Sequence, residues 1–177
     1  GAPARPGKLA VFDGMLGLVD DVDRHCTQGF KSPGDMVVLL GGSSTDSQGG
    51  LGGSEYLEVV HGLVAGRPAL DLAAEARLQR LVLDAISRGL LRSAHDCSEG
   101  GLAVALAEGA ISGGLGFQGQ VPQLAGRGDA SLFGEAPSRI VATVSVADQS
   151  HLEGLARAHD VPFQVLGRVG GERFAIK

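Results

Sequence analysis

A short polar cluster near the middle of the chain has the residue types of a catalytic or metal-binding site. It spans residues 95–99, His-Asp-Cys-Ser-Glu, and precedes two glycines and an apolar helical run. Asp96 could hold Mg²⁺ against phosphate oxygens, because Mg²⁺ takes one or two carboxylates and little else from a protein. His95 could act as a base or simply pair with Asp96. The alternative is a helix start whose polar groups are satisfied locally, with Ser98 as the capping residue.

A cysteine also lies in this cluster. A helix start would lower the pKa of the Cys97 thiol and make it more reactive. No partner that would activate a nucleophile can be identified in the sequence, so we do not expect a catalytic cysteine. Cys26 and Cys97 lie far apart and form no Cys-x-x-Cys pair, which argues against a disulfide framework and against a structural zinc site.

A glycine-rich stretch at residues 41–55 follows an apolar run and precedes an expected helix. A turn of this kind can aim backbone N–H groups at a phosphate. The named phosphate-binding motifs fail, because no Lys-Ser or Lys-Thr follows and the third glycine of a GxGxxG falls on Glu55. The alternative is a mobile surface loop. The candidate phosphate-binding residues are Gly52, Gly53, Ser54, Glu55, Gly100 and Gly101.

A third stretch with useful side chains is the turn at residues 133–139, Phe-Gly-Glu-Ala-Pro-Ser-Arg. Glu135 and Arg139 flank this turn and could grip a hydroxyl and a phosphate of a ligand. They could equally form a surface ion pair, which would contribute less than about 1 kcal/mol to stability.

The flanking hydrophobic patterns predict the elements that position these groups. Residues 36–40 are a continuous apolar run, typical of a strand buried on both faces. The clearest helix is expected over residues 71–89, with Asp71 as its N-cap. Gly170-Gly171 predicts a two-residue hairpin turn between the last two strands. The other helices are expected over 54–62, 98–113, 130–133 and 148–159, and the other strands over 8–19, 115–121, 139–146, 163–169 and 173–176.

The order of these elements predicts the fold class. After the first strands come three helices, then two strands, a helix and two strands. A doubly wound parallel sheet would alternate more strictly. We therefore expect an α+β fold with a mixed sheet.

Composition narrows the classes of function. The 177 residues are 44% hydrophobic and 20% charged, which indicates a packed core. The net charge of −5, the lack of basic runs and the scarcity of aromatics argue against nucleic-acid binding. No apolar run is long enough to span a membrane, and no signal peptide is visible, so a cytoplasmic setting is expected. The chain starts without Met and is expected to be a piece of a larger protein.

The polar cluster belongs to a longer phrase, residues 93–108, that resembles the AHDxSxGGLAxALAE signature of the phosphoribosylformylglycinamidine synthase family. The related aminoimidazole ribonucleotide synthetase, selenophosphate synthetase and HypE families carry different residues at this turn. Nearly the whole chain takes part in the resemblance. Further phrases occur in the family's order: GMLGLVDDV at 14–22, VVLLG at 37–41, LGGSEYL at 51–57, FGE with SR at 133–139, and LGRVGG at 166–171.

The resemblance implies a fold and a function. The family's enzymes consist of two related halves, and this chain resembles the tail of the second half. Residues 1–32 would end one α/β domain, and residues 33–177 would form a C-terminal domain with three α/β/α layers. The whole enzyme would convert formylglycinamide ribonucleotide, ATP and glutamine-derived ammonia to formylglycinamidine ribonucleotide. It would need ATP and Mg²⁺, and its partners would be the missing N-terminal domains, a glutaminase subunit and a small accessory subunit.

The resemblance also places catalysis elsewhere. The family's catalytic histidine and main ATP-contacting segments lie upstream, so we expect no catalytic residue here and no activity of this chain alone. The family's first half has a substrate-binding Glu-Ser-Gln, where this chain has Glu-Ala-Pro at 135–137. Asp96 would be the counterpart of a metal-binding Asp at an auxiliary nucleotide site. The alternatives are a HypE-like protein or a structural assembly domain without a nucleotide site.

Overall fold

The computed structural model describes residues 14, 16–19, 21–42, 50–121 and 127–177. The strands are β1 (Met36–Gly41), β2 (Leu91–Asp96), β3 (Phe117–Gly119), β4 (Arg139–Val144), β5 (Phe163–Val169) and β6 (Phe174–Ile176). The helices are α1 (Glu55–His61), α2 (Leu72–Ser87), α3 (Gly101–Gly113), α4 (Gly128–Phe133) and α5 (Gln149–Ala158).

The six strands form one mixed sheet in the order β2-β4-β1-β5-β3-β6. Neighbouring strands are antiparallel except β3 and β6, which are parallel. The α+β fold with a mixed sheet is therefore confirmed. β1 lies in the interior of the sheet, between β4 and β5, which explains why its sequence is apolar without interruption.

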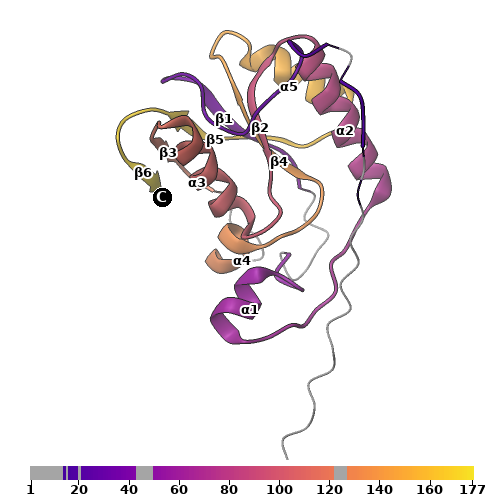
Figure 1. Ribbon diagram of the computed structural model, residues 1–177, viewed down its shortest axis with the longest axis vertical. Coiled ribbons are helices and arrows are strands. Elements are labelled where there is room, and N and C mark those ends of the chain that lie inside the picture. The colour runs from indigo at the N-terminus through magenta and orange to yellow at the C-terminus, as the bar shows by residue number, and fades with distance from the viewer. Residues whose placement is uncertain (1–13, 15, 20, 43–49, 122–126) are drawn as a thin grey trace, which may run out of the picture.

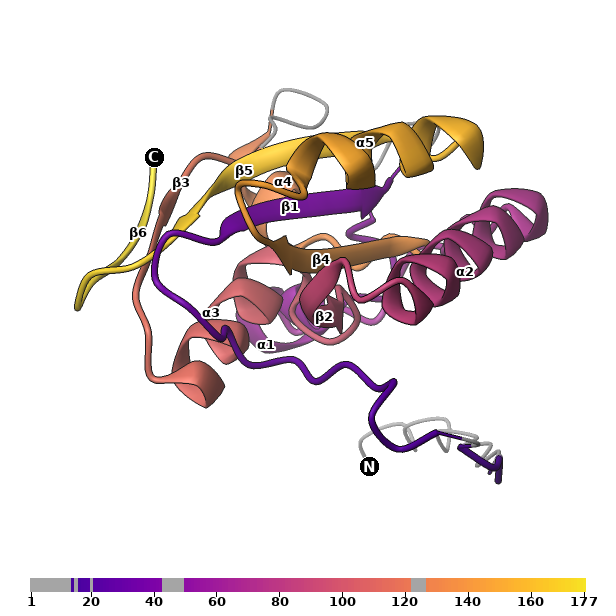
Figure 2. The same ribbon diagram turned by 90° about the horizontal axis from the view of Figure 1, so that it is seen from above.

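Helices cover both faces of this sheet (Figures 1 and 2). On one face, Val37 and Leu39 of β1 pack with Leu102 and Leu106 of α3. On the other face, the alternate residues of β1 pack against α2 and α5, with Leu81 and Leu152 fully buried. Successive strand residues point to opposite faces, so one apolar strand supplies both cores. The expected three α/β/α layers are present.

Short polar residues cap two helices, at Asp71 as predicted and at Ser54, where the helix over 54–62 was expected to begin. The Asp71 side chain accepts hydrogen bonds from the N–H groups of Ala73 and Ala74 at the start of α2. Ser54 does the same for Leu57 at the start of α1, and Gly62 ends α1 in the left-handed conformation. Short polar side chains at these positions satisfy N–H groups that the helix itself leaves unpaired.

The predicted cap of α3 is wrong. The N-cap of α3 is Gly100, at φ +78°, and no side chain caps this helix. Ser98 contributes its backbone carbonyl, which accepts from the N–H of Gly101 at 3.1 Å. Two glycines in the left-handed conformation let the chain turn into the helix without a side-chain cap.

The predicted hairpin at Gly170-Gly171 is also wrong. β5 and β6 are not neighbours, because β3 lies between them and pairs with both. The chain after Gly171 crosses β3 instead of folding back on β5. The backbone near this turn pairs with the strand in between: the N–H of Gly170 donates to Gly116 O and that of Gly116 to Gly171 O. A glycine pair allows a tight turn but does not fix which strand follows as the neighbour.

Some predictions fall at the limits of the described chain. Most of the expected strand at 8–19 lies outside the described residues, and Gly14 and residues 16–19 are in no strand. β3 is shorter than the strand expected over 115–121, and residues 122–126 after it lie outside the described residues. In the described part of the chain, no helix is long and apolar enough to cross a membrane.

Candidate functional site

Described residues of the three candidate stretches, 41–55, 95–99 and 133–139, lie close together at one end of the sheet. β1 ends at Gly41 and β2 ends at Asp96, while the antiparallel β4 between them begins at Arg139. Gly41 is the register partner of Arg139, and Asp96 is that of Ile140. The topology therefore brings the loop after β2 and the described ends of the loop after β1 to the turn before β4; residues 43–49 of the glycine-rich stretch lie outside the described residues. In Figure 1 this is the lower end of the molecule, where α4 and α1 lie.

A single carboxylate joins the three stretches. One oxygen of Glu135, Oε1, accepts hydrogen bonds from the backbone N–H groups of Glu55 at 2.9 Å and Gly100 at 2.8 Å. The N–H of Glu135 itself donates to Gly50 O at 2.8 Å. Hydrogen bonds to an ionised acceptor are stronger than neutral ones. Glu135 therefore ties the start of α1 to the start of α3.

Most of the expected phosphate-binding amides already have partners inside the chain. The N–H groups of Glu55 and Gly100 bind Glu135. Three more donate to backbone carbonyls, Gly53 to Ala65, Ser54 to Leu51 and Gly101 to Ser98. Ser54 is 2% exposed, and its hydroxyl donates to Leu51 O. Among these amides, a ligand could reach those of Glu55 and Gly100 only by replacing the Glu135 carboxylate.

The two glycines before α3 serve close packing. A Cβ on Gly101 would lie 2.4 Å from Gly134 O, and one on Gly100 would lie 2.4 Å from a methyl carbon of Val104. The sequence analysis gave both glycines as candidate phosphate-binding residues. In the structure, Gly101 instead approaches the turn that carries Glu135. The absence of side chains here is what allows that turn to reach the Gly100 amide.

Arg139 does not lie where the sequence placed it. It is 4% exposed and points inward, so the alternative of a surface ion pair with Glu135 is wrong. Its guanidinium donates to the backbone oxygens of Gly134 and Ala136, and its Nη1 has no partner among the described residues. Burial lowers the pKa of this group, because the charged form loses its hydration. Arg139 thus stabilises the turn through its backbone oxygens, and Glu135 is the side chain of this turn that binds the starts of α1 and α3.

We call Glu135 and the two backbone amides that it binds, those of Glu55 and Gly100, the junction. Asp96 and His95 lie beside the junction and differ in exposure. The Asp96 side chain is 67% exposed and that of His95 only 14%. The predicted contact between them is present at 3.3 Å, and His95 Nε2 also lies 2.7 Å from Glu108 Oε2. The Ser98 hydroxyl, through its hydrogen bond, is the main cause that lowers the pKa of the Asp96 carboxyl. Asp96 is therefore an exposed, ionised carboxylate, whereas His95 is held between two carboxylates.

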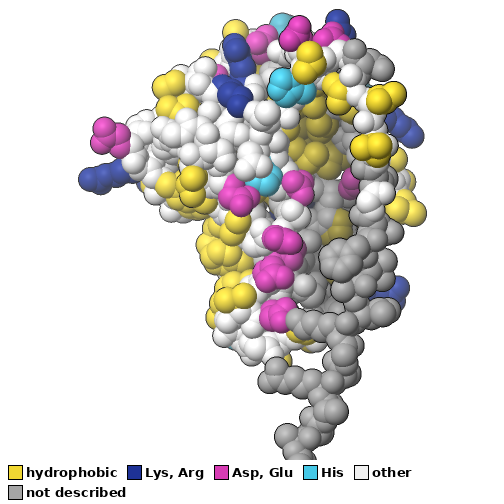
Figure 3. Space-filling model, in the orientation of Figure 1, with side chains coloured by type: hydrophobic (Ala, Val, Ile, Leu, Met, Phe, Trp, Pro, Cys, Tyr) yellow, Lys and Arg dark blue, Asp and Glu magenta, His cyan; other side chains and the backbone are white. Residues whose placement is uncertain are grey.

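Acidic side chains gather on this face of the molecule, with a histidine among them (Figure 3). No group of three or more metal-ligating side chains exists among the described residues. A protein-only cage such as Ca²⁺ or Zn²⁺ requires is therefore not formed there. One exposed carboxylate does fit Mg²⁺, which keeps most of its ligands as waters and phosphate oxygens. Asp96 is the residue that would hold it.

Cys97 is not reactive. It is 4% exposed, and burial raises the pKa of its thiol to about 11. The sequence suggested a lowered pKa at a helix start, but Cys97 lies before the Gly100 turn and packs into the core with Leu102 and Leu106. A thiol that stays protonated at neutral pH is a poor nucleophile. This agrees with the expectation of no catalytic cysteine.

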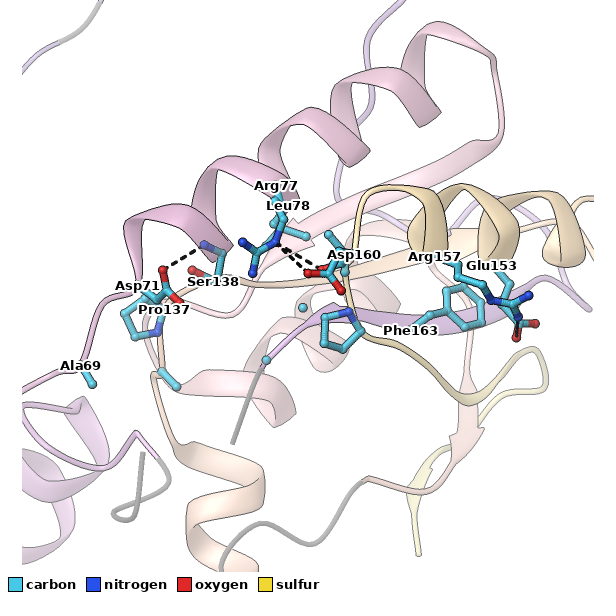
Figure 4. Close-up of a pocket in the computed structure, with 16 residues that line it drawn as sticks. Ala69, Asp71, Arg77, Leu78, Pro137, Ser138, Glu153, Arg157, Asp160 and Phe163 are labelled. Carbon is cyan, nitrogen blue, oxygen red and sulfur yellow. Dashed lines mark hydrogen bonds and ion pairs between the residues drawn. The ribbon is translucent and has the colours of Figure 1, made fainter. Parts of the chain in front are cut away.

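Two hollows flank the junction. One, of about 560 Å³, lies between α2 and α5. Both of its arginines are paired, Arg77 with Asp160 at 3.6 Å and Arg157 with Glu153 at 3.4 Å (Figure 4). It therefore offers no excess positive charge to a phosphate. The other, of about 760 Å³, borders Asp96 and is lined by Lys31 and His95 among others. The second hollow is better suited to a phosphate with its metal.

Residues 32–177 match the family described as "AIR synthase related protein, C-terminal domain". The chain belongs to this family. Among its curated relatives is the "Phosphoribosylformylglycinamidine synthase subunit PurL" of Moorella thermoacetica, which is 44% identical over 165 residues. That alignment covers 93% of this chain and 22% of the relative. This AIR synthase-related domain therefore spans about a fifth of the length of the curated relative it matches.

Solved structures share the fold of this AIR synthase-related domain. "T. maritima PurL complexed with FGAR" superposes with a TM-score of 0.73 at 23% identity, over 88% of this chain and 27% of that one. A thiamine-monophosphate kinase of Stenotrophomonas maltophilia superposes with a TM-score of 0.55 at 20% identity, over 86% of this chain and 52% of that one. At such low identity, these likenesses show the fold alone.

Two features of the site in this AIR synthase-related domain escaped sequence reasoning. Glu108, the partner of His95, closes the same sixteen-residue phrase, and that shared phrase was the available signal. The second is a stacked pair, Tyr56 of α1 on Phe133 of α4, with ring centroids 5.0 Å apart. No local pattern links these two rings, because they are 77 residues apart in the sequence and meet only through the fold.

Proposed function

We propose that this chain is the C-terminal domain of a phosphoribosylformylglycinamidine synthase. The enzyme would use ATP to activate the amide oxygen of formylglycinamide ribonucleotide as an iminophosphate, and ammonia would displace the phosphate. The observation that carries the proposal is the 44% identity to a curated synthase subunit across 93% of this chain. Several other relatives of the same name support it, which leaves the HypE-like alternative without support.

The proposed division of labour leaves this chain without catalytic residues. Residues 1–32 would complete the preceding domain, and residues 33–177 would form the C-terminal domain. The experiment is an assay with formylglycinamide ribonucleotide, ATP and ammonia on this chain alone and on a full-length synthase that carries it as its C-terminal part. We expect turnover only for the full-length protein. Turnover by this chain alone would contradict the division, and an inactive, well-folded full-length protein would contradict the function.

Within this enzyme, we propose that Asp96 holds Mg²⁺ and that the phosphates of a nucleotide lie against the amides near Gly52, Glu55 and Gly100. At Glu55 and Gly100 the phosphates would replace the Glu135 carboxylate. Solved structures of the related T. maritima PurL include complexes with ATP and with ADP. The acidic face around Asp96 would repel phosphates by itself, so a divalent cation is needed to join them. When bound, Mg²⁺ would neutralise phosphate charge. The hollow that borders Asp96 and Lys31 supports the position of the metal at Asp96.

Calorimetry with ADP tests the nucleotide site. We expect heat of binding for ADP with Mg²⁺ and none when Mg²⁺ is removed with EDTA. Asp96→Asn should abolish binding, since the amide carries no charge for the metal. Asp148→Asn, at the start of α5 and away from the junction, is the matched control and should bind as the wild type does. Binding that survives both EDTA and Asp96→Asn would exclude the metal site.

A second candidate is a purely structural domain without a nucleotide site. The observation that favours it is the internal pairing of the amides, in which Glu135 takes the place that a phosphate oxygen would occupy. In that case, neither this chain nor the full-length enzyme would bind ADP through Asp96. The absence of any heat from a full-length synthase in which only the upstream nucleotide site has been disabled would establish this alternative.

The remaining partners are inferred from the relatives. The solved structure called "Structure of PurLQS from Thermotoga maritima" is an assembly that contains PurL. We propose that the enzyme of this chain likewise works with a glutaminase subunit, which supplies ammonia, and with a small accessory subunit. A cytoplasmic setting stays a prediction.

A further inference from the structure

The segment that contains α1 and leads to α2 forms an exposed surface that the proposed function does not explain. Every residue from Glu58 to Ala73 is exposed. Six large aliphatic side chains are among them, each more than half exposed. They are Val59 at 77%, Val60 at 57%, Leu63 at 53%, Val64 at 69%, Leu70 at 57% and Leu72 at 74%. We call these six residues the apolar segment.

The apolar segment is held in a defined shape although α1 buries no residue. The N–H of Leu63 donates to Leu57 O at 3.0 Å, and the N–H of Gly53 donates to Ala65 O at 2.7 Å. Tyr56 stacks on Phe133 and anchors α1 to α4. A helix of seven residues is not stable in water by its own propensity. These backbone and ring contacts therefore hold the segment in place, and more than half of the surface of each aliphatic side chain stays exposed.

The composition of this stretch is that of a protein–protein interface. Between Val59 and Ala73 the charged residues are Arg67 and Asp71, and Asp71 is occupied as the N-cap of α2. Scattered exposed aliphatic residues are ordinary, but six within fourteen positions mark a contact surface. Depletion of charge is typical of the centre of such surfaces. The apolar segment has the chemistry of a surface that another protein layer covers.

The relatives of this chain indicate which protein surface covers the apolar segment. This chain covers 22% of its Moorella relative and 27% of a PurL structure. It covers 52% of the thiamine-monophosphate kinase. In each case about as much protein again, or more, accompanies this fold in the same polypeptide. We propose that the apolar segment docks onto an apolar surface of the upstream part of the same synthase polypeptide. The proposal rests on the function proposed above.

This docking would bear on the candidate site. The first residue of α1, Glu55, is held by Glu135 at the junction, and the last turn of α1 carries Val59 and Val60. Seven helical residues span only about 10 Å. The upstream part of the enzyme would therefore lie within one short helix of the Asp96 and Glu135 groups. Covering α1 would also stabilise this end of the domain, because α1 contributes no buried residue to the core.

Thiol labelling tests the docking with two matched positions. Val59 and Ile111 are 77% and 79% exposed and lie on α1 and α3. Each is changed to Cys in a Cys26→Ser background, since Cys97 is buried. Maleimide labelling is then followed in this chain alone and in a full-length synthase that carries it. We expect Val59→Cys to label roughly tenfold more slowly in the full-length protein, as a protected site would, and Ile111→Cys to change little.

Each outcome decides the proposal. Equal labelling of Val59→Cys in both proteins would overturn it. Equal slowing at Val59→Cys and Ile111→Cys would overturn the assignment to this surface. Slow labelling of Val59→Cys in this chain alone, relieved by dilution, would show that a second copy covers it instead. A synthase assay on the same full-length protein separates the two proposals, because slowed labelling without activity would keep the docking and reject the enzymatic function.

Discussion

The body of the sheet and the junction around Glu135 are held together by different forces. The body rests on two apolar clusters, one on each face of β1, in which Val37, Leu40 and Leu106 have no exposed surface. The junction rests on a few hydrogen bonds to one carboxylate, and α1 beside it buries no residue. The fold can therefore be stable while the candidate site depends on single contacts. Substitutions in the two regions should have different signatures.

The largest effect is expected in the body. Leu106→Ala removes a fully buried side chain from the cluster between α3 and the sheet. It should lower the free energy of unfolding by about 2–5 kcal/mol, because the transfer free energy is lost and a cavity remains. Ile111→Ala on the same helix, at a position 79% exposed, is the control and should change it by less than about 0.5 kcal/mol. Urea unfolding measures both, and similar losses would show that α3 does not bury Leu106.

A smaller effect is expected where the junction meets α3. Gly101→Ala should cost the strain of the left-handed backbone, about 1–2 kcal/mol, together with displacement of the 134 carbonyl that lies 2.4 Å from the new Cβ. Gly114→Ala, at φ +64° with nothing within 4 Å, should cost the backbone strain only. Thermal unfolding of the two variants separates the effect of the close contact from that of backbone strain. Equal losses of stability would mean that Gly101 is needed only for its left-handed backbone conformation.

The carboxylate at the junction should control local rather than global stability. Glu135→Ala leaves the N–H groups of Glu55 and Gly100 without their acceptor, which should cost about 1–3 kcal/mol at that end of the molecule. Glu135→Gln keeps an acceptor oxygen but loses its charge, so its effect should be smaller. Hydrogen exchange should speed up at these two amides and not in β1. Faster exchange throughout β1 would place Glu135 in the folding core instead.

The smallest effect concerns a surface pair at the start of α4 that takes no part in the hydrogen bonds of Glu135. Asp129 pairs with Arg127, and the hydrogen bond from Arg127 lowers the pKa of its carboxyl to about 2. A depressed folded-state pKa stabilises the protein above the unfolded value near pH 4, and this stability is lost as the pH falls toward 2. The difference in Tm between wild type and Asp129→Asn should therefore shrink between pH 5 and pH 2. A difference that stays constant would show that the pair does not contribute.

Local features could be predicted from the sequence, whereas contacts between distant segments could not. The apolar run at 36–40 and the caps at Ser54 and Asp71 are local signals, and the structure agrees with them. The inward Arg139 was missed because burial of a charge depends on backbone oxygens that only the folded turn brings near it. The bridging role of Glu135 was missed because its two donors lie 80 and 35 residues away.

Nuclear magnetic resonance of this chain tests the proposed nucleotide site most directly, because every residue of that site belongs to this chain. Amide signals are followed while ADP is added in the presence of Mg²⁺. We expect shifts at Gly52, Glu55 and Gly100, with none at Gly116 and Gly170, which pair at the opposite end of the sheet. Unchanged signals at the three junction amides at saturating ADP, or equal shifts at Gly116 and Gly170, would contradict it.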